Sequence, residues 1–169
     1  MTINIKPNIH NLTICVNVYI RKDRKYLVIK RSSTRTYLPE FVQPVGGRVE
    51  LNENPYQAAV REVSEEAGIT IKKLKLEAVS LEMHPQNPKI TNWLVFHFSA
   101  NYQSGKIKRT DEGELVMLSP GEFKKEKLFA PTRRLASHIF NPKDGTVFAS
   151  FDLDNNLEII KEDIKLCAL

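Results

Sequence analysis

Three glutamates in one short segment have the type and spacing to hold a metal ion. Glu62, Glu65 and Glu66 fall within five positions, and spacings of three and four residues place side chains on one face of a helix. Three carboxylates there repel one another by roughly a few tenths of a kcal/mol per pair. A charged run is more often a solvated helix face, but carboxylate oxygens are also the ligands that Mg²⁺ and Mn²⁺ prefer. The cluster therefore predicts a divalent cation on this face.

The residues around the acids predict the helix that carries them. Asn54 and Pro55 suit the N-cap and the first helical position, and Gln57 stands where a capping-box partner belongs. Gly68 suits the left-handed turn that ends many helices. We expect a helix over about residues 55–67, with the acids opposite its apolar side. The residues expected on that apolar side are Tyr56, Ala59, Val60, Val63 and Ala67.

Two glycines before this helix indicate what the cation would serve. Gly46 and Gly47 follow a predicted strand, and a glycine turn leading into an acid-bearing helix can bring backbone N–H groups and carboxylates to one small volume. Mg²⁺ is usually bound through one or two carboxylates together with substrate phosphates. The formal net charge of +5 and the pI of about 9.2 fit a polyanionic partner. We expect a phosphate-bearing ligand whose charge the metal neutralises.

The order of these residues resembles the Nudix box of the MutT-like hydrolases. Gly47 is followed after five residues by Glu53, and after seven more by REVSEEAGI at residues 61–69. Seven fixed identities at an average usage of about one in fifteen give a chance match of roughly 10⁻⁸ per window. The resemblance implies an α/β Nudix fold, an αβα sandwich with a central mixed β-sheet. It also implies Mg²⁺-dependent attack of water on phosphorus in a nucleoside diphosphate linked to another moiety. Mn²⁺ is the alternative metal.

The resemblance also implies roles for individual residues. The metal ligands would be Glu62, Glu65, Glu66 and Gly46. Arg61 matches an arginine that braces the box by pairing with a carboxylate such as Glu53.

The general base stays open among three acids. Many family members place a further glutamate on a loop after the sheet, and the segment TDEGELVML (110–118) supplies two. We rank Glu114 first, Glu112 second and Glu62 third, with an exposed turn as the alternative for either loop acid.

Residues outside the box each have a functional and a structural interpretation. Lys30 and Arg31 end a predicted strand where the family often carries a basic residue near the phosphates, or else they face water. Trp93 and Phe96 could stack on a base, or fill the core at strand spacing. Pro85 falls 16 residues after Ile69, a spacing that resembles the ADP-ribose subgroup of the family.

The remaining patterns indicate interleaved strands and helices in one unit. Strands are expected at 12–20 and 26–31, joined as a hairpin, and at 73–83 and 92–102. Ser119 and Glu122 form a capping-box signature for a helix to about residue 126. A further helix should start near Pro131, with Leu135, Ile139 and Phe140 on its buried side. We expect one Nudix hydrolase domain over 1–169, with 146–169 as a C-terminal β-hairpin extension.

Composition narrows the class of protein. No apolar run is long enough to span a membrane, and the N-terminus lacks the apolar core of a signal peptide, so we expect a cytoplasmic location. Cys15 and Cys167 have no metal or redox spacing, so both are expected to be plain thiols.

The expected partner is a small nucleotide or phosphorylated metabolite: a nucleotide sugar, ADP-ribose or a nucleoside triphosphate. The alternatives are an RNA 5′-end pyrophosphohydrolase and a non-catalytic nucleotide sensor. Nucleic acid and membrane are not expected as partners, and the oligomeric state stays open, with a homodimer as one option.

Overall fold

The computed structural model describes residues 12–87, 91–108 and 110–168. Its strands are β1 Leu12–Lys22, β2 Lys25–Arg31, β3 Val42–Pro44, β4 Ile69–Met83, β5 Asn92–Gly105, β6 Gly113–Leu118, β7 Thr146–Leu153 and β8 Ile159–Cys167. Its helices are α1 Pro55–Glu62, continued by a π-helical segment η1 at Val63–Ala67, then α2 Pro120–Phe123 and α3 Ala130–Phe140.

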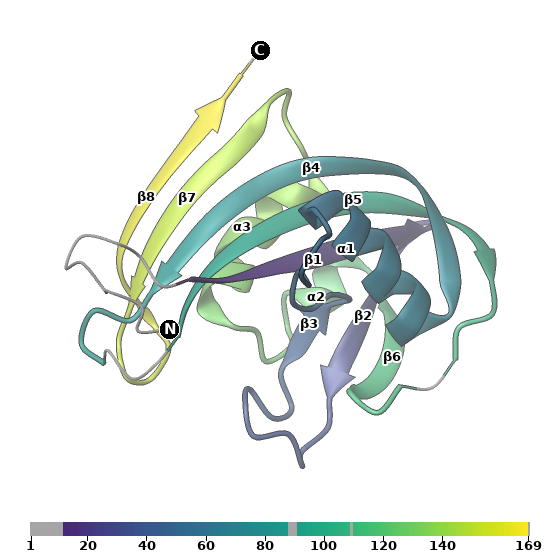
Figure 1. Ribbon diagram of the computed structural model, residues 1–169, viewed down its shortest axis with the longest axis horizontal. Helices are drawn as coiled ribbons and strands as arrows, with labels where there is room; N and C mark the ends of the chain where they lie inside the picture. The colour runs from purple at the N-terminus through teal and green to yellow at the C-terminus, as the bar shows by residue number, and fades with distance from the viewer. Residues whose placement is uncertain (1–11, 88–90, 109, 169) are drawn as a thin grey trace.

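The strands within these residues form one mixed sheet in the order β3-β2-β1-β5-β4-β7-β8, with β6 paired to β2 (Figure 1). Two pairs, β1 with β5 and β4 with β7, are parallel, and the other pairs are antiparallel. The expected hairpin of β1 and β2 is present, and its turn places Asp23 in the left-handed region with φ 57°. The strand expected from residue 73 begins earlier, at Ile69, because bulges let β4 stay paired to β5.

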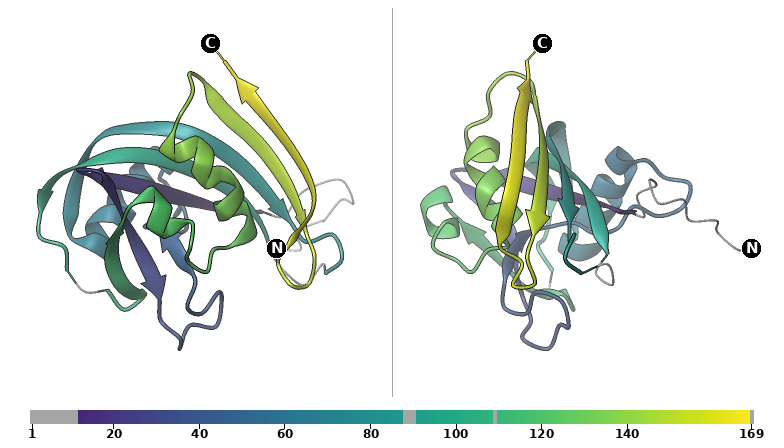
Figure 2. Two further views of the ribbon diagram at one scale, coloured as in Figure 1. Left: turned by 180° about the vertical axis from the view of Figure 1, so that it is seen from behind. Right: turned by 90° about the vertical axis from the view of Figure 1, so that its left-hand side faces the viewer.

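Helices cover both faces of the sheet, as Figures 1 and 2 show. On one face, Ala58 and Ala59 of α1 and Val63 and Ala67 of η1 belong to one buried apolar cluster. On the other face, α3 contributes Leu135, Ile139 and Phe140 to a second cluster, as expected from its pattern. The expected sandwich of helices around a mixed sheet is therefore confirmed.

The helix that carries the acids differs from its prediction in two respects: its last turn is the π-helical segment η1, and two residues expected on its buried side are exposed. Both of its caps form as expected, with reciprocal Asn54 and Gln57 bonds and Gly68 at φ 68°. The prediction that Tyr56 and Val60 face the core is wrong, because they are 55% and 44% exposed. The helix instead rests its small residues, such as Ala58, against the sheet, and the larger side chains lie on its flank.

The helix expected over 119–126 is shorter than predicted. Its capping box of Ser119 and Glu122 is present, but α2 ends at Phe123. The amides of Lys125 and Glu126 each bond three residues back, so the chain tightens into turns there.

The C-terminal residues form the expected hairpin. β7 pairs with β8 antiparallel, and β7 also lies parallel to β4, so the hairpin widens the main sheet. β8 is the last strand at this edge in the described part of the chain. No helix among the described residues is long and apolar enough to cross a membrane, and Cys15 and Cys167 are both free thiols.

The glycine turn before α1 runs directly against β1. Val16 N–H donates to the Gly47 carbonyl at 2.9 Å, and Val18 N–H donates to the Val45 carbonyl at 2.7 Å. A Cβ on Gly46 would lie 2.0 Å from the Val16 carbonyl oxygen, and its φ is 156°. A side chain at this position therefore cannot be accommodated unless the backbone moves.

We expect Gly46→Ala to lower the free energy of unfolding by more than about 1 kcal/mol, because both the contact and the backbone angle oppose a side chain. Urea denaturation followed by circular dichroism measures the change. The control is Gly121→Ala in α2, where no atom lies within 4 Å of the new methyl group and a helical alanine is favourable. Equal stability of the two variants would contradict this account of the turn.

Candidate active site

One cavity of about 610 Å³ collects acidic, basic and aromatic side chains from several strands, loops and helices. The strands β1, β4 and β5 contribute Cys15, Asn17, Glu82, Trp93 and Val95. The end of β2 and the segment after it contribute Arg31, Arg35, Tyr37, Leu38 and Phe41. The start of α3, the glycine turn, the acid-bearing helix and the loop before β6 contribute Phe129, Thr132, Gly46, Gly47, Arg48, Glu62, Glu66 and Glu112. We call this the site cavity.

Two of the three clustered glutamates line the site cavity. A Glu66 carboxylate oxygen accepts the Gly46 N–H at 3.1 Å. The Glu62 carboxylate lies against Gly47, where a Cβ would come within 2.4 Å of its oxygen. Burial and, to a smaller extent, the neighbouring Glu62 raise the pKa of Glu66 to about 7 against the opposing effect of the Gly46 N–H. Burial also raises the pKa of Glu62. The turn thus holds two carboxylates close together at the cavity wall.

Arg61 braces this arrangement from outside the cavity. Its guanidinium donates to both oxygens of Glu53, at 2.7 and 3.1 Å, so the expected pairing is present. It also donates to Glu62 at 3.0 Å, to Glu65 at 2.9 Å and to the Arg48 carbonyl at 3.0 Å. The bonds from Glu53 and Glu65 raise the pKa of Arg61 above its usual range. Arg61 therefore ties the glycine turn to the acid-bearing helix.

The π-helical segment explains why the three acids do not point the same way. A π turn contains about one residue more than an α turn, so side chains four positions apart nearly overlie, while those three apart diverge. Glu62 and Glu66 accordingly share the cavity, whereas the side chain of Glu65 is 60% exposed and binds Arg61. Single-turn π segments recur at functional sites.

The donor set suits a hard divalent cation. Nowhere in the described chain do three carboxylate, histidine or cysteine side chains converge as a metal cage. Glu62 and Glu66 supply two carboxylates at one wall, and Gly46, whose carbonyl is the expected further ligand, lies beside Glu66. Mg²⁺ usually takes only one or two carboxylates and completes its shell with water and substrate phosphates. The residues therefore fit a metal that binds together with a phosphate.

Two arginines of the site cavity carry the opposite charge. Arg31 donates to Glu112 at 3.2 Å, and Arg35 donates to the other oxygen of the same carboxylate. Both guanidinium groups thus share the carboxylate of Glu112. Sequence reasoning did not single out Arg35, because its segment carries no motif and the pairing joins residues 77 positions apart.

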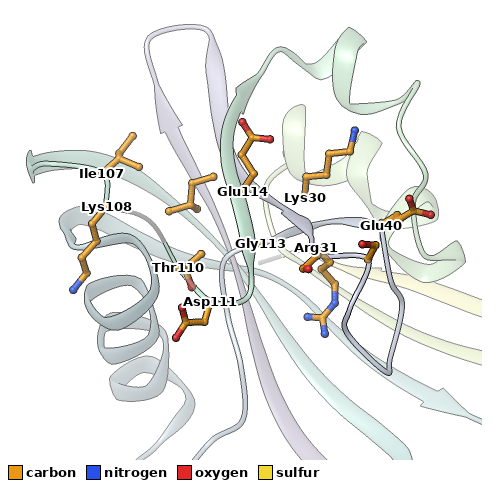
Figure 3. A pocket seen from close by; sticks show the side chains of 12 residues that line it. Lys30, Arg31, Glu40, Ile107, Lys108, Thr110, Asp111, Gly113 and Glu114 are labelled. Atoms are coloured by element: carbon orange, nitrogen blue, oxygen red, sulfur yellow. The ribbon is translucent and has the colours of Figure 1, made fainter.

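Glu114 does not join the acids of the site cavity. It lies on β6 opposite Lys30 of β2, and it lines a separate cavity of about 840 Å³. Figure 3 shows Glu114 and Lys30 extending to one side of this cavity while Arg31 extends to the other. Of the two loop acids, only Glu112 lines the site cavity.

One part of the site cavity, which we call its inner end, holds the aromatic rings of Tyr37 and Trp93 and the buried acid Glu82. The rings of Tyr37 and Trp93 stack with centroids 5.8 Å apart, and both line the cavity, whereas Phe96 packs against the core on the other face of the sheet. Glu82 is only 5% exposed, and burial raises its pKa to about 7. Sequence analysis missed Glu82, although polar Ser80 and Glu82 alternate with apolar residues on a strand that is otherwise suited to a core.

The buried acid predicts how stability depends on pH. Because the pKa of Glu82 is higher in the folded state, the folded protein holds this proton more strongly, and that stabilisation is lost as pH rises through about 7. We expect Glu82→Gln to raise the free energy of unfolding more at about pH 8 than at about pH 5, measured by urea denaturation. The exposed Glu40→Gln is the control. A constant difference between wild type and Glu82→Gln across this range would contradict the expectation.

The fold and this arrangement of acids define a Nudix protein, and comparison with known families agrees. The NUDIX domain family matches residues 11–139, so the chain belongs to the Nudix family. The chain is a Nudix hydrolase of the MutT-like kind, as expected from the box.

Individual relatives agree with this membership. The chain is 28% identical over 127 residues to the 8-oxo-dGTP diphosphatase of Escherichia coli K12, covering 73% of this chain and 98% of the relative. A MutT protein from Bacillus halodurans has the same fold with a TM-score of 0.80 at 20% identity, covering 91% of this chain and 98% of that one. A MutT protein from Methanosarcina mazei Go1 superposes with a TM-score of 0.67 at 22% identity, covering 79% and 98%.

Proposed function

We propose that this protein is a Mg²⁺-dependent pyrophosphohydrolase that cleaves a diphosphate linkage in a nucleoside triphosphate or another nucleoside-diphosphate derivative. One observation supports this most: a single cavity carries two carboxylates at one wall and two arginines that share an acidic partner at another. Carboxylates bind the cation, arginines bind phosphate, and the aromatic inner end suits the rest of a nucleotide.

Different residues of the cavity would bind the metal and the phosphate. Glu62, Glu66 and the Gly46 carbonyl would hold the metal, and Glu65 could join them only by leaving Arg61. A bound Mg²⁺ neutralises phosphate oxygens and lowers the pKa of water. Arg31 and Arg35 would take phosphate oxygens in place of Glu112.

Release from the arginines would make Glu112 available as a general base. Its carboxylate already lies at the cavity wall, and a phosphate bound by Arg31 and Arg35 would leave its oxygens free to take a proton from the attacking water. Glu112 therefore becomes our first candidate for the base, ahead of Glu114.

Exchanging each loop acid for its amide tests this order. We expect Glu112→Gln to lower kcat by about 10²-fold or more, and Glu114→Gln to lower it by less than about tenfold. Steady-state kinetics with one cleaved nucleotide gives both values. The reverse order would restore Glu114 as the base.

A panel of phosphorylated substrates tests the proposed activity. Nucleoside triphosphates come first, since a relative is named for 8-oxo-dGTP, followed by ADP-ribose, nucleotide sugars, dinucleoside polyphosphates and capped RNA. With Mg²⁺ present, we expect a nucleoside monophosphate and either pyrophosphate or a phosphorylated remainder. In ¹⁸O water the label should enter a phosphate product, because water attacks phosphorus. Label in the non-phosphate product would contradict the mechanism.

Two other functions remain as outcomes of the same panel. Preference for RNA 5′ ends would appear with a steep salt dependence, because many phosphate contacts release many counterions. Tight binding without turnover by either Mg²⁺ or Mn²⁺ would indicate a nucleotide sensor. A cytoplasmic location and a homodimer are further proposals that the panel does not address.

A further inference from the structure

A chain of buried polar groups lies behind the inner end of the site cavity. The Ser80 hydroxyl donates to one oxygen of Glu82 at 3.0 Å, and the same hydroxyl lies 2.8 Å from Nε2 of His97. Nδ1 of His97 lies 3.5 Å from the side-chain nitrogen of Asn17. Ser80, Glu82 and His97 are at most 5% exposed, so these groups have little access to water.

With Glu82 ionised, the donors and acceptors along this chain take one consistent order. Because the Ser80 hydroxyl gives its proton to Glu82, its oxygen must accept from His97, which places the ring proton on Nε2. Burial lowers the pKa of His97 to about 3, so the ring is neutral and Nδ1 is an acceptor. Asn17 must then turn its NH₂ group toward His97, which leaves its carbonyl oxygen for the site cavity that it lines.

This order also determines which oxygen of the Glu82 carboxyl group is available to a ligand. One carboxyl oxygen is committed to Ser80, and the other has no hydrogen-bond partner among the described residues. Glu82 also has no cation among its hydrogen-bond or ion-pair partners in this part of the chain. An oxygen of a mostly buried carboxyl group gains from a hydrogen-bond partner, and Glu82 lines the site cavity, where a ligand could supply one.

We propose that Glu82, held in place by Ser80 and His97, is the specificity residue that recognises the hydrogen-bonding edge of a nucleobase. This inference rests on the proposed function, since it assumes that the phosphates lie between the arginines and the acids of the same cavity. A nucleobase edge carries N–H donors beside acceptors. A carboxyl group can pair with such an edge, and the Asn17 oxygen would accept a further N–H.

The lining of the cavity favours a base over a sugar at this end. Tyr37, Phe41, Trp93 and Phe129 present flat or apolar surface, and aromatic rings stack well on a planar heterocycle. A sugar carries many hydroxyl groups, and the few polar groups here could satisfy only a small share of them. The base would therefore point inward and the phosphates toward Glu62 and Glu66.

Binding to Trp93 gives a readout that does not depend on catalysis. Trp93 is the one tryptophan of the sequence, so intrinsic fluorescence reports on this cavity. The probes are α,β-methylene analogues of nucleoside triphosphates with different bases, titrated with Mg²⁺ present. A base-free triphosphate of 1-deoxyribose is the reference probe.

We expect Glu82→Leu to weaken binding of the preferred nucleotide analogue by about tenfold or more, because a hydrogen bond to a buried group is lost. Binding of the base-free probe should change by less than about twofold. The matched control is Glu77→Gln, a buried glutamate on the same strand that bonds Ser99 and Lys75 outside the site cavity. It should leave both affinities unchanged.

Ser80→Ala is a second variant in case Glu82→Leu does not fold. It removes the hydroxyl that orients Glu82, and it should relax the preference among bases while leaving the base-free probe unaffected. Equal affinities of wild type and variants for every nucleotide analogue would overturn the role of Glu82, even if the substrate panel shows cleavage. If the wild type neither binds nor cleaves any nucleotide, the proposed function itself fails.

Discussion

Glu66→Gln should lower kcat by about 10²-fold or more while the protein stays folded. The amide oxygen can still accept the Gly46 N–H, so the turn should keep its geometry. The amide is a poorer metal ligand than a carboxylate, and the loss should therefore fall on turnover. Steady-state kinetics and urea denaturation of the same preparations separate the two effects.

Unfolding should become slightly less favourable in this variant, because a partly buried charge beside Glu62 is removed. Glu65→Gln is the informative comparison, since its carboxylate lies outside the cavity on Arg61, and we expect the smaller loss there. Wild-type turnover in Glu66→Gln would exclude this carboxylate from the reaction.

Removal of divalent cations should abolish hydrolysis completely. Two carboxylates and a backbone oxygen form an incomplete shell, so the metal should bind weakly without substrate and exchange readily. We expect EDTA to stop turnover and added Mg²⁺ or Mn²⁺ to restore it, measured by release of the nucleoside monophosphate.

EDTA saturated with Mg²⁺ is the control, and it should have no effect on the rate. Turnover that persists in metal-free EDTA would contradict the assignment of Glu62 and Glu66 as metal ligands.

The sequence predicted helix ends that depend on contacts between residues close together in the chain. Both capping boxes form because their bonds join residues three positions apart, as with Asn54 and Gln57 or Ser119 and Glu122. The prediction from α-helical periodicity that Tyr56 is buried was wrong, because small residues face the sheet instead. Periodicity also did not reveal the π-helical segment. The box likewise indicated Glu62 and Glu66 correctly as neighbours, but not that Glu65 turns to Arg61.

Apart from Trp93, the sequence did not indicate which residues form the inner end of the cavity, because strand register brings them together. Asn17 and His97 meet because β1 and β5 pair in a particular parallel register, and Glu82 lies opposite Trp93 because β4 pairs with β5 around its bulges. Such registers depend on the whole sheet. Nothing near Glu82 in the sequence marks it as a cavity residue apart from an unexpected polar position.

Among the described residues no strand pairs with the outer edge of β8, and such an edge is a template for adding another strand because it exposes backbone N–H and C=O groups. Four charged residues interrupt it: Lys161, Glu162, Asp163 and Lys165. Glu162 is held by Arg134 of α3 at 2.9 Å, which ties this strand to the helix behind it. Charges along an edge disfavour pairing with a second copy. The hairpin that widens the sheet thus also ends it with a strand poorly suited to aggregation.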